Sequence, residues 1–181
     1  RDTKILDIGC GLGLWTCHLA KLGAEVWAID ISPQSVAVTR RRAQLNGLAD
    51  RVHAGVMSAT NLAFPDASFN LVHGQDIMHH VEADAFGKEV ARVLVDDGTA
   101  VFSENSANNP VLMLARNQLC GRFGISKWGS DDEYPLTRAK RRQFATHFQN
   151  NRQAYPEFWF LFLFDAKLFH YKKPLVTKMC R

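Results

Sequence analysis

Short apolar segments alternate with helix-like segments over the first hundred residues of this 181-residue chain. Strands and helices that follow one another at this spacing are typical of βαβ units, which form a parallel sheet covered on both faces by helices. The alternation therefore predicts an α/β fold with a Rossmann-like, doubly wound, mostly parallel sheet. The expected strands are 4–10, 25–30, 51–59, 69–73 and 99–103, and the expected helices are 12–22, 33–46, 83–95 and 137–150.

Three closely spaced glycines stand where the first strand should pass into the first helix. Gly9, Gly11 and Gly13 let the backbone turn sharply and let a ligand approach the main chain. The start of the helix offers unpaired N–H groups and the positive end of its dipole. Asp30 ends the second strand, where a carboxylate can accept hydrogen bonds from ribose hydroxyls. Together these features predict an adenosine-type ligand at the carboxyl ends of the strands.

The glycine spacing leaves more than one cofactor class open. The nicotinamide fingerprint is G-x-G-x-x-G, and Leu14 stands at its third glycine position. An NAD(P)-dependent oxidoreductase is therefore a weaker hypothesis, and a phosphate-binding loop of the G-K-[ST] type is excluded. A module that binds its cofactor without catalysis is a further alternative.

Four segments in order resemble the motifs of class I S-adenosylmethionine-dependent methyltransferases of the small-molecule, ubiquinone/menaquinone-methylase-like type. They are LDIGCGLG (6–13), AIDIS (28–32), NLAFPDASFNLV (61–72) and EVARVLVDDGTAVFSE (89–104). The resemblance implies methyl transfer from S-adenosylmethionine to an oxygen, nitrogen or carbon atom of a small organic molecule, with S-adenosylhomocysteine as product. It specifies no particular acceptor.

The resemblance also implies a set of cofactor contacts. Asp7 is expected to hold the glycine loop, in which Gly9, Cys10, Gly11 and Gly13 line the methionine part of the cofactor. Other contacts are expected on the ribose, the adenine and the cofactor's amino acid group. In that order they are Asp30 for the ribose, Ile31, Ser58 and Ala59 for the adenine, and His73, Gly74 and Gln75 for the amino acid.

Candidates for the chemistry follow the fourth and fifth strands. Asp76 could act as a base or hold a cationic substrate, or it could simply cap a helical turn. His79 and His80 are adjacent, so we expect at most one of them to face a pocket. His80 fits the histidine pattern of the resembling family and is the one assigned a catalytic role. Glu104 could touch the substrate or tether the segment that follows it.

Residues 105–136 are too long for a simple connection and are expected to form a helical lid over the substrate. Phe123, Trp128 and Tyr134 in this segment could pack on an aromatic or lipid-like substrate. A sixth strand is expected at 153–164. The whole chain, 1–181, is interpreted as one domain that lacks part of the family fold at both ends.

Composition limits the partners. Apolar residues make up 46% of the chain and charged residues 22%, and the formal net charge is +4. The basic runs have no interleaved aromatic residues, so no nucleic acid partner is expected. The longest apolar run, FWFLFLF at 158–164, is too short to span a membrane. The four cysteines fit no zinc spacing, so we expect reduced thiols, no metal and a cytoplasmic location.

Overall fold

Five parallel strands form the centre of the molecule in a computed structural model that describes residues 3–105, 113–114, 118 and 135–154. The strand order in the sheet is β3-β2-β1-β4-β5. Every neighbouring pair is parallel. The strands are β1 (Lys4–Ile8), β2 (Glu25–Asp30), β3 (Val52–Val56), β4 (Phe69–Gln75) and β5 (Leu94–Ser103). The prediction of a Rossmann-like parallel sheet is confirmed.

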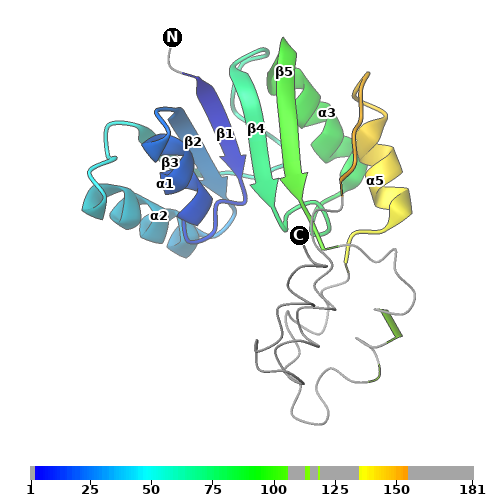
Figure 1. The fold of residues 1–181 in the computed structure, drawn as a ribbon, viewed down its shortest axis with the longest axis horizontal. Coiled ribbons are helices and arrows are strands. Elements are labelled where there is room, and N and C mark those ends of the chain that lie inside the picture. The colour runs from blue at the N-terminus through cyan, green and yellow to red at the C-terminus, as the bar shows by residue number, and fades with distance from the viewer. Residues whose placement is uncertain (1–2, 106–112, 115–117, 119–134, 155–181) are drawn as a thin grey trace, which may run out of the picture.

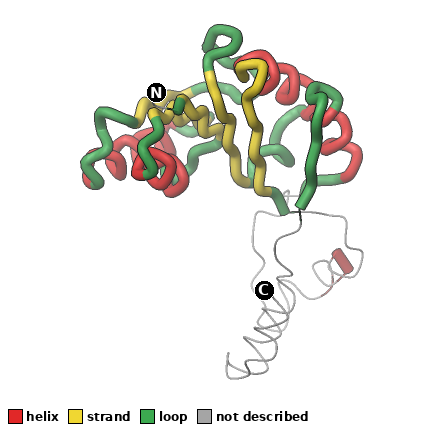
Figure 2. Tube along the Cα trace, turned by 45° about the horizontal axis from the view of Figure 1, so that its top comes forward, coloured by secondary structure: helices red, strands yellow, loops and turns green. Residues whose placement is uncertain are grey.

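Helices cover both faces of this sheet, as expected. Figure 1 shows α1 (Leu14–Lys21) and α2 (Pro33–Leu45) on one side of the sheet, and α3 (Ala83–Val93) and α5 (Arg138–Ala145) on the other. The turned view in Figure 2 shows the same separation. From β1 the chain adds β2 and β3 on one side of the sheet and then β4 and β5 on the other, so the order of addition reverses between β1 and β4. Ligands of such sheets bind at the carboxyl ends of the strands near this point.

The apolar residues divide between the two faces because side chains alternate along a strand. On β1, Ile5 joins a cluster with the buried side chains of α1 and α2, whereas Leu6 and Ile8 join a larger cluster with α3 and α5. Phe86 and Val90 of α3 are fully buried in that larger cluster. Asp7 lies between Leu6 and Ile8, so its side chain points to the face that carries α1.

One arginine joins the two later segments that carry the family resemblance. Arg92 of α3 donates to the carbonyl oxygens of Leu62 and Phe64 at 2.9 and 2.7 Å and pairs with Glu89 at 2.8 Å. This pairing lowers the pKa of Glu89. Glu89 also accepts the backbone N–H of Leu62 at 2.7 Å. The segment 61–72 is therefore held on α3 at the point where it enters β4.

Several predicted boundaries are wrong. The helix expected over 83–95 ends at Val93, because Leu94 takes an extended conformation and pairs with Phe69. The fifth strand therefore begins five residues earlier than predicted, and it contains a register shift opposite Phe69 and Leu71. The third strand is shorter than predicted, since residues after Val56 turn and Ser58 forms an isolated bridge with Asn61. The helix expected over 137–150 ends at Ala145.

The predicted lid, apart from its two ends and three internal residues, lies outside the described residues. So do most of the predicted sixth strand and all of 165–181. The backbone N–H of Leu136 donates to the carbonyl oxygen of Asn105 at 2.8 Å, so the segment between them leaves and re-enters the fold at one place beside β5. None of the helices that the structure describes is long and apolar enough to cross a membrane.

Candidate functional site

The glycine loop is built on three left-handed backbone conformations and is supported from α2. Gly9, Gly11 and Gly13 have φ angles of 71°, 51° and 72°. A Cβ atom at Gly13 would lie 2.7 Å from Oγ1 of Thr39, which is fully buried. The Thr39 hydroxyl donates to the carbonyl oxygen of Gly11 at 3.1 Å. No pattern in the sequence indicates Thr39, whose role depends on the packing of α2 against the loop.

Asp30 connects the end of β2 to the same loop. One carboxylate oxygen accepts the N–H of Gly11 and the other accepts the N–H of Ser32, both at 2.9 Å. Each oxygen has a second lone pair, so the carboxylate can still accept bonds from two hydroxyl groups. The predicted ribose contact is compatible with this geometry and stays a prediction.

Apolar side chains lie open to solvent next to this carboxylate. Ile31 is 76% exposed and Leu12 is 57% exposed. An adenine ring would remove such side chains from water, so a polar carboxylate flanked by uncovered apolar groups fits an adenosine ligand. Ser58 and Ala59, predicted at the adenine edge, are half-buried, and the Ser58 hydroxyl accepts the N–H of Thr60 at 3.3 Å.

Cys10, inside the loop, packs against Thr39 of α2. Its side chain is buried, and its sulfur lies 3.6 Å from Oγ1 of Thr39. Burial raises the pKa of the Cys10 thiol to about 11. The sequence placed Cys10 among residues that line the cofactor, and that contact remains a prediction.

We expect Cys10 to resist alkylation in the folded protein, because only the thiolate reacts and its share increases only as the pH approaches 11. At pH 8, iodoacetamide should label Cys10 at least about a hundredfold more slowly in the native protein than in urea. Peptide mass spectrometry of timed samples measures this difference. Equal rates in the two states would contradict a buried thiol at this position.

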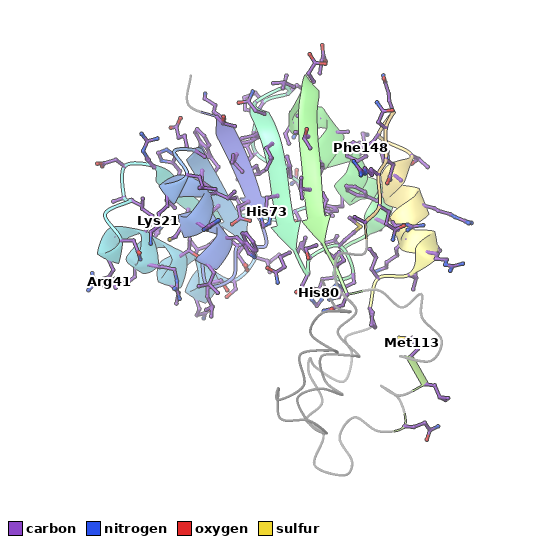
Figure 3. All side chains as sticks on the ribbon, viewed as in Figure 1. Lys21, Arg41, His73, His80, Met113 and Phe148 are labelled. Carbon is purple, nitrogen blue, oxygen red and sulfur yellow. The ribbon has the colours of Figure 1, made fainter. Side chains whose placement is uncertain are left out.

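A buried carboxylate lies below the loop on the α1 face. Asp7 is 2% exposed, and its two oxygens accept from the Thr16 hydroxyl at 2.5 Å and from Nδ1 of His73 at 2.8 Å. Asp7 and His73 are register partners on β1 and β4. Figure 3 shows His73 at this position between the two strands. Asp7 therefore supports the region of the loop through the side chains of Thr16 and His73, and the sequence predicted neither of these two contacts.

Polar side chains continue along the carboxyl ends of the strands. The indole N–H of Trp15 donates to the side-chain oxygen of Gln75. The Gln75 amide in turn donates to Asp76 at 3.3 Å, and the Asn105 side chain donates to the other oxygen of Asp76 at 3.1 Å. This row joins the α1 end of the glycine loop to the residues that follow β4 and β5.

Glu104 organises the turn that follows β4. One of its oxygens accepts the backbone N–H groups of Ile77 and Met78 at 2.9 and 2.7 Å, and the other accepts Nδ1 of His79 at 2.8 Å. The side chains of Glu104 and His79 are 6% and 5% exposed. Glu104 therefore tethers the 77–79 turn, which is neither of the two roles that the sequence left open for it, and its predicted contact with the substrate stays a prediction.

Asp76 has a different environment. Its φ angle is 52°, an unfavourable conformation for a residue with a side chain. Glu104 already receives the N–H groups of the following turn, so the capping role considered for Asp76 is taken by another residue. In the part of the chain that the structure describes, only the two side-chain amides donate to the Asp76 carboxylate.

The structure brings His79, and not His80, next to the two acids. His80 is exposed, and its ring packs on that of His79 with the centroids 4.1 Å apart. Figure 3 shows His80 at the end of the sheet where β4 and β5 terminate. The catalytic role assigned to His80 from the sequence stays a prediction.

Asp76, His79 and Glu104 are also the residues most able to hold a metal. Each offers one ligand atom, and these atoms lie within 4.8 Å of one another. However, the His79 nitrogen and both Glu104 oxygens already form hydrogen bonds that hold the turn. A metal bound through Nδ1 of His79 would break the bond between His79 and Glu104, which is part of what holds the turn.

Comparison with known proteins identifies the family. A family model described as a methyltransferase domain matches residues 5–98, which include the glycine loop, Asp30 and the whole of β4. The chain belongs to this methyltransferase family. It is a class I, S-adenosylmethionine-dependent type by motif and by strand order, and the match favours this class over the nicotinamide-dependent oxidoreductases.

Individual relatives agree with this assignment. The ubiquinone biosynthesis O-methyltransferase of Methylocella silvestris is 36% identical over 100 residues, which are 55% of this chain and 38% of the relative. The norajmaline N-methyltransferase of Rauvolfia serpentina is 36% identical over 111 residues, 60% of this chain and 38% of the relative. The chain thus spans about two fifths of the length of these relatives.

A solved structure shares the fold over a larger part of the chain. It was determined in work on the conversion of a disulfide bond into a thioacetal group during echinomycin biosynthesis. Its sequence is 27% identical and its TM-score is 0.62, with 80% of this chain and 62% of the other covered.

Proposed function

We propose that this protein transfers a methyl group from S-adenosylmethionine to a small organic molecule. The observation that carries the proposal is the supported glycine loop, with Asp30 at one side and the Asp7–His73 pair at the other. Bound S-adenosylmethionine would supply a methyl group on a positively charged sulfur. The uncovered Ile31 and Leu12 side chains beside Asp30 fit the adenosine part of this cofactor.

The residues of the chain divide into binding and acceptor groups. Gly9, Cys10, Gly11 and Gly13 would lie along the methionine part, Asp30 would hold the ribose, and Ile31 would pack on the adenine. Ser58 and Ala59 would complete the adenine site, and His73, Gly74 and Gln75 would contact the amino acid group. Asp76 would face the acceptor, either taking a proton from it or holding its positive charge. His80 remains a second candidate for proton transfer, and Glu104 would position the turn between them.

The acceptor class is supported by the names of relatives. An O-methyltransferase of ubiquinone biosynthesis matches over 100 residues and an N-methyltransferase of norajmaline over 111 residues. Both names describe small organic acceptors, which supports an oxygen or nitrogen atom here. The aromatic residues of 105–136 support an aromatic or lipid-like acceptor. We further propose that the enzyme has no nucleic acid substrate and acts in the cytoplasm.

We expect methyl transfer to be independent of added metal, since the possible ligand atoms of His79 and Glu104 are used in hydrogen bonds. The protein is first treated with about 10 mM EDTA and then dialysed. The initial rate of methyl transfer should change by less than about twofold, because the proposed reaction needs no metal ion to polarise the acceptor. Restoration of a lost rate by Mg²⁺ or Mn²⁺ would show instead that the Asp76, His79 and Glu104 cluster holds a metal.

The proposal is tested by methyl transfer from S-adenosylmethionine labelled in its methyl group to a panel of phenols, quinols, secondary amines and small enols. Label is expected in the organic extract for at least one class, with S-adenosylhomocysteine formed in equal amount. Tight binding of the cofactor with no transfer to any class would favour the non-catalytic module. Hydride transfer with a nicotinamide cofactor would favour the oxidoreductase alternative.

A further inference from the structure

The backbone of Asp76 is fixed by the end of β5. Its N–H donates to the carbonyl oxygen of Ser103 at 2.9 Å, and the preceding residue, Gln75, is the register partner of Ser103. The φ angle of 52° at Asp76 is one that residues with a side chain rarely adopt. Such a conformation persists only where surrounding contacts hold it, and positions of this kind concentrate at functional sites. The backbone therefore supports a function for the Asp76 side chain.

Two side-chain amides hold the carboxylate of Asp76, one on each oxygen. The amide of Asn105 donates to Oδ1 at 3.1 Å, and the amide of Gln75 donates to Oδ2 at 3.3 Å. Because a carboxylate oxygen has two lone pairs, each oxygen keeps one for a further group. The two donors thus restrict rotation of the carboxylate and leave it able to contact the molecule that is methylated.

The main chain of Asn105 is anchored on both sides, although its side chain is exposed. It directly follows Glu104, whose carboxylate accepts the backbone N–H groups of the 77–79 turn. Its own carbonyl oxygen accepts the N–H of Leu136 at 2.8 Å, and Leu136 is buried in the larger apolar cluster. The Asn105 amide therefore extends from a fixed backbone toward Asp76, on which it is one of the two donors within the described residues.

Resting on the proposed function, we propose that Asn105 is a positioning residue for methyl transfer, which acts through Asp76 by holding its carboxylate toward the methyl acceptor. Asn105 itself takes no proton and forms no bond to the transferred methyl group. A reacting group that is displaced by about 1 Å loses much of the rate that correct placement provides. Removing the Asn105 amide therefore lowers kcat and leaves the binding of cofactor and acceptor nearly unchanged.

Two substitutions separate this role from a structural one. Asn105→Ala removes the amide, and Asn105→Asp keeps its size but has no N–H to donate to Asp76. Both keep the carbonyl oxygen that accepts from Leu136. Each is also combined with Asp76→Asn, so that a double-mutant cycle measures the coupling between the two positions. Asn70→Ala is the matched control, because Asn70 is an exposed asparagine that accepts the N–H of Lys4 at 3.0 Å near the opposite end of β4.

The rates are measured at saturating S-adenosylmethionine with the compound of the acceptor panel that is methylated fastest, and titration calorimetry gives the Kd of S-adenosylhomocysteine. We expect both Asn105 variants to lower kcat about tenfold and to change the acceptor KM and this Kd less than about twofold. In the Asp76→Asn protein the same substitutions should change kcat less than about twofold, because no base is left to position. The control should change none of these values.

Three results would overturn the inference while leaving the proposed methyl transfer intact. They are an unchanged kcat in the Asn105 variants, an equal loss of kcat with and without Asp76→Asn, and a Kd for S-adenosylhomocysteine that weakens as much as kcat falls. A normal kcat for Asp76→Asn alone would also overturn it, since Asn105 would then have no base to act through. An unsubstituted protein that binds S-adenosylhomocysteine but methylates no compound of the panel would overturn both proposals.

Discussion

Replacing Asp76 with asparagine is expected to lower kcat for methyl transfer by about 10²- to 10³-fold, the range typical of a lost general base. Asparagine has nearly the shape of aspartate and keeps the contacts of Gln75 and Asn105 possible after an amide rotation. It cannot take a proton or neutralise a cationic acceptor. The loss should therefore appear with acceptors that must be deprotonated and should be small with acceptors that are already anionic.

The measurement is the initial rate of methyl transfer at saturating cofactor, with two supporting readouts. The Kd for S-adenosylhomocysteine and the thermal midpoint should stay close to those of the unsubstituted protein, since Asp76 lies outside the apolar core. Asp50→Asn, an exposed aspartate in the turn before β3, is the matched control and should leave kcat unchanged. A kcat within about threefold of normal for Asp76→Asn would exclude Asp76 as the base.

Replacing Glu104 with alanine should cause the largest loss of stability among the site residues. Removing the carboxylate leaves the N–H groups of Ile77 and Met78 and the ring of His79 without their acceptor. At about 1 kcal/mol or more for each buried unsatisfied group, the expected loss is about 3 kcal/mol. For a chain of this size that corresponds to a decrease of roughly 6–12 °C in the thermal midpoint.

Glutamine at the same position separates hydrogen bonding from charge. Its amide oxygen can still accept from the two backbone N–H groups, so Glu104→Gln should lose only about 1 kcal/mol, mostly from the contact with His79. Urea unfolding monitored by circular dichroism measures both variants. Alanine and glutamine variants of equal stability would contradict the assignment of Glu104 as the acceptor that holds the turn.

Local patterns in the sequence were enough to predict the parallel sheet and the glycine loop. Alternating apolar runs predicted the five strands. Gly9, Gly11 and Gly13 indicated the turn, because glycine readily adopts the left-handed backbone conformations that this junction contains. Boundaries were less predictable where tertiary pairing decides them. Leu94 has apolar helix-like spacing with α3, but its pairing with Phe69 places it in β5.

Contacts between residues far apart in the chain could not be predicted from local sequence patterns. Asp7 and His73 are 66 residues apart and meet only because β1 and β4 pair in one register. His79 and Glu104 are 25 residues apart and meet because β5 lies next to β4. The sequence placed all four at or near strand ends, yet a shift of one residue in either register would turn each side chain to the opposite face. His80 was chosen over His79 because it fits the histidine pattern of the resembling family, and no local pattern indicates the contact of His79 with Glu104.

The most direct test of the account is a thermal-shift titration with S-adenosylhomocysteine, S-adenosylmethionine and the nicotinamide dinucleotides, on the unsubstituted protein and on Asp30→Ala. A ligand present at 100 times its Kd adds about 2.7 kcal/mol to the folded state. We predict an increase of roughly 5–10 °C in the midpoint with the two sulfur compounds only, and its loss in Asp30→Ala. An increase with a nicotinamide dinucleotide and none with S-adenosylhomocysteine would contradict the proposed cofactor site.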